Sequence, residues 1–302
     1  MHAACFRNLM ALAATVTALG MPGAPARAEP ILHHVHGLAF TPDGKALAVP
    51  AHTGLAVYRD GRWSLAPGPA HDYMGFSVAK GGIYSSGHPD PRSPLRNPFG
   101  LMKSPDGGKT WQSLGLGGEA DFHLLAAGYH TNAVYVVNEE PNSRMQRPGL
   151  HYTTDDGKTW KRSAAAGVSA QVIGIALHPT EPGTLALGTL GGLFLSRDFG
   201  ATFKRIGMAP RATAVLFDFD GKHLYFASDG NDALLRVSFD GRLNASLNLP
   251  RMEKDFVFYI AQNPAKPAEL AIATRRKNVF LSPDAGKSWK QIASEGSDAN
   301  AK

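Results

Sequence analysis

Side chains that can bind a metal ion gather in the first half of this 302-residue chain. They are histidines, carboxylates and one methionine in or beside short apolar segments: His34, His36, His52, Asp72, Met74, His88, Asp121, His123 and Glu139. Imidazole is a ligand for zinc, copper, nickel and iron, and a thioether favours Cu(I). A carboxylate beside an imidazole can accept its second N–H and so orient the ring. The set is typical of a metal site, provided that the fold brings it together.

A repeated turn motif indicates which elements position these residues. Four segments share the pattern S/T-x-D-x-G-x-T/S-W/F, at residues 104–111, 153–160, 196–203 and 282–289. The Asp is suited to accept backbone hydrogen bonds in a tight turn, and the Gly supplies a positive φ. The starts of these segments are 49, 43 and 86 residues apart, and degenerate copies stand at 58–63 and 238–241. Six repeats of about 43 residues predict a six-bladed, all-β propeller.

The turn motif resembles the Asp-box (BNR-type) repeat of sialidases, sortilin-type receptors and the propeller factors of photosystem II assembly. The resemblance implies that each motif joins the third and fourth strands of a blade, away from the usual binding face. Residues 34–40, 72–76, 84–89 and 121–129 further resemble an exported bacterial group classed as glycosyl hydrolases. That closer resemblance covers nearly the whole chain after residue 28 and implies a sialidase-like fold.

The repeat register places the candidate ligands on one rim of the propeller. Each repeat opens with an apolar segment that should line the central channel: 34–40, 72–78, 121–127, 171–177, 212–218 and 256–262. Alternate residues of a strand share a face. The third position is His36, Met74 or His123 in the first three repeats, and the first position is His34, Asp72 or Asp121. Loops expected at the same end add His52, His88 and Glu139, with His33 and His71 nearby.

The leading hypothesis is a copper site with His36, Met74 and His123 as ligands. His34, His52 and His88 are additional candidate ligands, and Asp72, Asp121 and Glu139 are candidates for orienting the imidazoles. If Met74 is a wall residue, His34 or His88 together with His36 and His123 suits zinc instead. Two alternatives use the same rim: a site for a glycan or small polar molecule, and a docking surface for an exported protein client.

The enzyme hypothesis is narrower. The resemblance to sialidases implies three arginines around a substrate carboxylate, but the six inner segments contain no Arg. Asp72 and Asp121 remain a carboxylate pair for another glycoside hydrolase, a class that requires two such groups. No Ser/His/Asp order, phosphate loop or dinucleotide fingerprint is visible, so neither a nucleotide nor an organic cofactor is expected.

The composition and the first residues predict an exported, periplasmic protein. Residues 1–28 read as a signal peptide, with a basic start, an apolar run too short to span a membrane, and a small-x-small end. Cleavage after Ala28 would remove Cys5, the one cysteine, and lower the formal charge from +6 to +4 because Arg7 and Arg27 leave. Residues 29–294 should form one monomeric propeller, followed by a tail at 295–302. The basic residues form no aromatic-interleaved stripe, which disfavours nucleic-acid binding.

Overall fold

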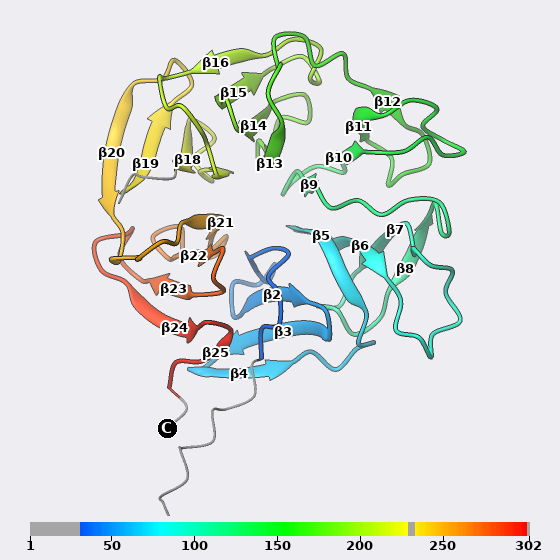
Figure 1. Ribbon diagram of the computed structural model, residues 1–302, viewed down its shortest axis with the longest axis horizontal. Coiled ribbons are helices and arrows are strands. Elements are labelled where there is room, and N and C mark those ends of the chain that lie inside the picture. The colour runs from blue at the N-terminus through cyan, green and yellow to red at the C-terminus, as the bar shows by residue number, and fades with distance from the viewer. Residues whose placement is uncertain (1–30, 229–232, 301–302) are drawn as a thin grey trace, which may run out of the picture.

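The computed structural model describes residues 31–228 and 233–300, which form a ring of six small β-sheets (Figure 1). The described ranges contain 25 strands and no helix, and therefore no helix that could cross a membrane. The sheets follow one another along the chain, and each is built from consecutive antiparallel strands. The predicted six-bladed, all-β propeller is confirmed. The predicted signal peptide lies outside the described residues.

The first three blades each have four strands. Blade 1 consists of β1 (Ala39–Phe40), β2 (Leu47–Ala51), β3 (Gly54–Arg59) and β4 (Arg62–Leu65). Blade 2 consists of β5 (Asp72–Ala79), β6 (Gly82–His88), β7 (Leu101–Ser104) and β8 (Gln112–Gly115). Blade 3 consists of β9 (Leu125–Ala127), β10 (Val134–Asn138), β11 (Gly149–Thr153) and β12 (Lys161–Arg162). Blade 4 consists of β13 (Val172–Leu177), β14 (Leu185–Thr189), β15 (Gly192–Ser196) and β16 (Lys204–Ile206). Blade 5 consists of β17 (Ala214–Phe217), β18 (His223–Ala227), β19 (Ala233–Ser238) and β20 (Leu243–Asn248).

Blade 6 has a fifth strand. It consists of β21 (Val257–Gln262), β22 (Leu270–Thr274), β23 (Val279–Ser282), β24 (Lys290–Ser294) and β25 (Ser297–Asp298). The short β25 lies in the segment that the sequence assigned to a C-terminal tail, and it pairs with β24.

The first strand of each blade arises from a predicted channel segment and contacts the first strands of the neighbouring blades, so that these strands surround the axis: β1, β5, β9, β13, β17 and β21. Figure 1 shows β5, β9, β13 and β21 near the centre of the ring. Two of the six first strands are short, because β1 begins only at Ala39 and β9 only at Leu125. The residues before these strands, including His34, His36 and His123, therefore enter the channel mouth outside the regular ladder. Their side chains therefore need not point alternately to the two faces of a sheet, as side chains within a strand do.

Each pair of neighbouring blades is joined by its own hydrophobic cluster, so the ring has six separate cores. The cluster between blades 1 and 6 contains Leu32, Val49 and Ile292, all fully buried. Leu32 N donates to Gly296 O at 2.8 Å, and Trp63 Nε1 donates to Ile292 O at 2.8 Å. Segments near both ends of the described chain thus close the ring by packing and hydrogen bonds, while each blade keeps its own consecutive strands.

The four Asp-box turns join the third and fourth strands of blades 2, 3, 4 and 6, as the resemblance implied. In blade 3, Asp155 Oδ1 accepts hydrogen bonds from Thr159 N at 2.9 Å and from the Thr153 hydroxyl at 2.7 Å. Its Oδ2 accepts from the Thr159 hydroxyl at 2.7 Å, and Gly157 has a φ of 77°. The other three turns repeat this network. The box residues therefore stabilise the fold at the end of the ring opposite the strand 2–strand 3 loops.

We expect Asp155→Ala to lower the melting temperature by a few degrees, because three donors lose their acceptor. These hydrogen bonds, led by that from Thr159 N, lower the pKa of Asp155 from 3.8 to about 2. A carboxyl group with a lowered folded-state pKa adds stability above its ordinary pKa, and this stability is lost as the pH falls through the folded value. Calorimetry should therefore show a smaller difference between wild type and variant at pH 2 than at pH 7. An equal difference at both pH values would contradict the assignment.

Candidate metal centre

The predicted ligands lie at the end of the ring where the innermost strands begin. His52 lies in the loop between β2 and β3, and His88 ends β6 before the loop to β7. Glu139 is exposed in the loop that follows β10. In an up-and-down blade these loops share one end with the start of the first strand, so the register predicted from the repeats holds.

Three imidazoles from blade 1 form a compact group, which we call the three-histidine cluster: His34, His36 and His52. One ring nitrogen from each lies within 4.8 Å of the others. The ring centroids of His34 and His52 are 4.2 Å apart, and those of His36 and His52 are 4.9 Å apart. Nitrogens bound to one ion at about 2.0–2.1 Å lie roughly 3.3–3.6 Å apart. Small side-chain rotations would therefore bring all three onto one metal.

A carboxylate from blade 2 fixes one of these rings. His52 Nδ1 lies 2.6 Å from Asp72 Oδ2, which assigns the Nδ1 proton to a hydrogen bond with the carboxylate. In the neutral ring, Nε2 of His52 then carries the free lone pair. This is the carboxylate–histidine arrangement that orients ligands at metal sites. The contact is the one that an orienting role of Asp72 would require, and that role stays a prediction.

The surroundings of His34 and His36 favour their neutral, metal-binding forms. His36 Nε2 is buried and has no hydrogen-bond partner in the described structure. Burial, reinforced by the nearby His52, lowers the pKa of His36 from 6.5 to about 4. Partial burial also lowers the pKa of His34. A buried nitrogen without a partner is costly, and a metal ion bound to its lone pair would remove that cost.

A second group of polar side chains lies between blades 2 and 3. His88 Nε2 is 3.0 Å and His123 Nε2 is 3.6 Å from Asp121 Oδ2. His88 Nδ1 also lies 2.7 Å from Asn97 Oδ1. The structure thus divides the predicted set: His34, His36 and His52 with Asp72 in one group, and His88 and His123 with Asp121 in the other.

The set His36, Met74 and His123, predicted from aligned positions, stays a prediction, while the close imidazole contact of His36 is with His52 of its own blade. His36 and His123 precede short strands, and the β5–β6 register shifts between Tyr73 and Phe76, around Met74. Equivalent positions in the three repeats therefore do not share one geometry. Met74 is half-buried on β5, and its role as a ligand stays a prediction.

His71 belongs to the packing of blade 2. It is buried, accepts a hydrogen bond from Asp90 N at 3.0 Å through Nδ1, and packs against Tyr73 and Phe99. Burial is the main cause that lowers its pKa. His33, by contrast, is exposed at the mouth.

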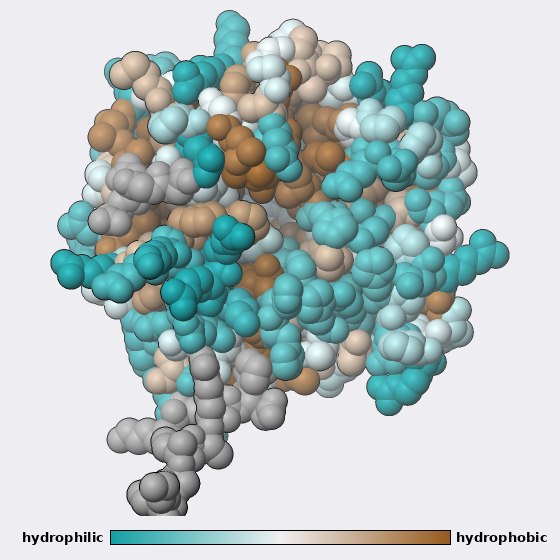
Figure 2. Space-filling view, viewed as in Figure 1, coloured by the Kyte–Doolittle hydropathy of each residue, from teal (hydrophilic) through white to brown (hydrophobic). Residues whose placement is uncertain are grey.

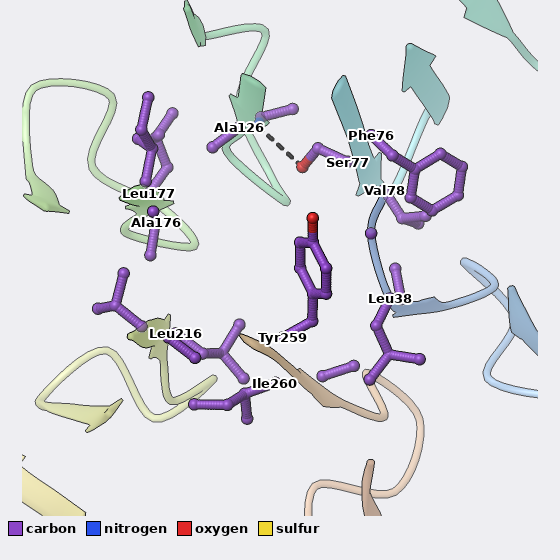
Figure 3. Close-up of a pocket in the computed structure, with 18 of the residues that line it drawn as sticks. Leu38, Phe76, Ser77, Val78, Ala126, Ala176, Leu177, Leu216, Tyr259 and Ile260 are labelled. Carbon is purple, nitrogen blue, oxygen red and sulfur yellow. Dashed lines mark hydrogen bonds between the residues drawn. The ribbon is translucent and has the colours of Figure 1, made fainter. Parts of the chain in front are cut away.

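Below the mouth, the channel holds a cavity of about 180 Å³ whose lining includes His36 and His123. Figure 3 shows the Tyr259 hydroxyl directed into this space among apolar side chains such as Leu38 and Leu216. In Figure 2, hydrophobic residues are visible near the middle of the face, where the blades converge, and hydrophilic residues cover much of the rest. Tyr259 was not among the predicted residues, because those came from the first and third positions of each segment and Tyr259 is in the fourth.

Comparison with known proteins supports the fold. Residues 151–162 match the model of the BNR/Asp-box repeat. No curated protein matches the chain by sequence. A GH74 enzyme of Niastella koreensis superposes with a TM-score of 0.57 at 16% identity, covering 88% of this chain and 46% of that one. An ancestral GH74 enzyme gives 0.51 at 12% identity, covering 87% of this chain and 39% of that one.

YCF48, in a structure with a bound D1 peptide, gives a TM-score of 0.50 at 16% identity, covering 91% of this chain and 88% of that one. The chain spans less than half the length of the two GH74 enzymes. At these identities the likeness is one of fold. Six consecutive four- or five-stranded blades, four complete Asp-box turns and the repeat match identify the chain as a six-bladed β-propeller with Asp-box repeats.

Proposed function

We propose that this protein binds a copper ion at the mouth of its central channel through His34, His36 and His52, with Asp72 orienting His52. The observation that carries the proposal is the approach of three imidazole nitrogens to within 4.8 Å of one another. The buried, unpartnered Nε2 of His36 supports it, because a metal ion is the partner that a neutral imidazole nitrogen lacks there.

Copper is the preferred ion on chemical grounds. Neutral imidazoles suit both copper and zinc, and among the divalent first-row ions Cu(II) is the one that nitrogen sites bind most tightly. Three protein ligands leave a coordination position open. Such a site suits the handling of a metal, or its delivery to another protein. The predicted signal peptide adds the proposal that this takes place outside the cytoplasm, in the maturation of an exported client.

Metal uptake tests this proposal directly. The purified chain, without an affinity tag, is equilibrated separately with Cu(I), Cu(II) and Zn(II), and bound metal is counted by atomic emission. We expect about one equivalent of copper per chain, and none in the His34→Ala/His36→Ala/His52→Ala variant. His130→Ala, at the opposite end of the ring, should bind as wild type does. Absence of stoichiometric uptake, or uptake that survives the triple substitution, would overturn the proposal.

The similarity of fold to GH74 enzymes keeps glycoside hydrolysis as a second candidate on the same rim. Asp72 and Asp121 would be its two carboxyl groups, although each is in contact with an imidazole. Turnover of a glycan that disappears in Asp72→Asn would favour this candidate. The similarity of fold to YCF48, whose structure includes a D1 peptide, likewise supports the docking of a client protein as a candidate, on the basis of the fold alone.

A further inference from the structure

A groove of about 530 Å³ runs from the three-histidine cluster to blade 6. Its lining includes His34 and His36 of the cluster, and Phe256 and Phe258 from the start of blade 6. Arg275 and Lys277 lie on the loop between β22 and β23, which ends at the same rim as His52 and also lines the groove. The groove is therefore continuous with the candidate metal site.

The two cations of this groove, Arg275 and Lys277, differ in their ion pairing from Arg276, which lies between them in the sequence. Arg276 forms an ion pair with Glu295 at 2.7 Å. In the ranges that the structure describes, neither Arg275 nor Lys277 has an acidic partner within ion-pair distance. The Arg275 guanidinium lies 5.9 Å from the centre of the Phe256 ring. Two positive charges without an ion-pair partner, beside aromatic side chains, are suited to an anion with an apolar body.

The loop holds Lys277 in place at the groove. Lys277 is half-buried and has a left-handed φ of 64°. Its N–H donates to Thr274 O at 3.0 Å, and its carbonyl accepts from Gly296 N at 3.0 Å. Its charge acts on the cluster as well, since it is one of the causes that lower the pKa of His34, after partial burial and His52. The backbone of Lys277 is thus fixed by hydrogen bonds, and its side chain lines the groove near His34.

We propose that this groove binds a small organic carboxylate, with the carboxylate between Arg275 and Lys277 and an aromatic or aliphatic body against Phe256 and Phe258. A guanidinium presents paired N–H donors that match a carboxylate. In metal-loaded protein, the ligand is also placed to complete the open coordination position beside His34 and His36, and this second step rests on the proposed function.

Calorimetric titration with benzoate tests the groove in both metal-free and copper-loaded full-length protein. We expect saturable binding of benzoate, and weaker binding of benzamide and of inorganic phosphate. Lys277→Gln and Arg275→Gln should each weaken benzoate binding about tenfold or more, since each removes a charged hydrogen-bond donor. Lys287→Gln is the matched control: it removes the same charge from the same blade, in the Asp-box turn at the opposite end. Copper should tighten benzoate binding.

The outcomes separate the two proposals. Benzoate binding that needs Lys277, in a protein that takes up no metal, would support the groove and overturn the metal site. Copper uptake without benzoate binding would support the metal site and overturn the groove. Equal binding of benzamide, tighter binding of phosphate, or equal effects of Lys277→Gln and Lys287→Gln would overturn the carboxylate assignment. Binding that copper leaves unchanged would overturn the coordination step.

Discussion

Replacing His36 by alanine is expected to lower the affinity for copper by about a hundredfold or more, since one of three donors is lost. His36 is the ligand best prepared for an ion: its Nε2 is buried without a partner, and its pKa of about 4 keeps the ring neutral at pH 7. A competition titration against a coloured copper chelator measures the change. The melting temperature of the metal-free variant, measured in parallel, shows whether the fold is intact.

Four further variants decide which set of residues holds the ion. Asp72→Asn should weaken binding by about 10–100-fold, because an amide carbonyl accepts the His52 Nδ1–H less strongly than a carboxylate does. His123→Ala should have a smaller effect than His36→Ala if the three-histidine cluster is the site. If His123→Ala and Met74→Leu abolish binding while His52→Ala does not, the ligand set predicted from aligned positions is correct and the three-histidine cluster is not the site.

The fold could be predicted from the sequence because its signal is periodic. Each Asp-box motif demands the same turn wherever it occurs, so spacing alone gave the number of blades and the end of the ring at which each loop lies. The rim location of His52, His88 and Asp72 followed from this register. These features depend on chain order and strand alternation, which a repeat preserves.

The grouping of the site residues could not be predicted in the same way. His34 and His36 approach the channel before β1 begins, and the bulge of β5 changes the direction of side chains around Met74. Position in a repeat then no longer fixes which side chains meet. The groove at Lys277 was missed for a related reason, since its left-handed φ and its contact with Gly296 arise from the packing of blade 6 against the end of the chain.

Gly75→Ala should destabilise the protein by about 2–3 kcal/mol and lower its melting temperature by roughly 3–5 °C. A Cβ at Gly75 would lie 2.0 Å from Phe122 O, a backbone atom of the next blade that cannot move aside as a side chain would. The same contact is tied by hydrogen bonds, from Ser85 Oγ to Gly75 O at 2.8 Å and from Phe122 N to Ser86 Oγ at 2.9 Å. The close approach therefore sets the distance between blades 2 and 3.

Gly81→Ala is the matched control in the same blade, because a Cβ there meets no atom within 4 Å. Equal melting temperatures for the two variants would show that the blades can separate freely. The expected difference also reaches the site: Gly75 follows Asp72 by three residues, and Phe122 directly follows Asp121. Moving β5 to relieve the clash would shift the carboxylate that orients His52. The folded fraction of Gly75→Ala should therefore bind copper more weakly than Gly81→Ala, which would identify blade spacing as the feature that aligns the three-histidine cluster with Asp72.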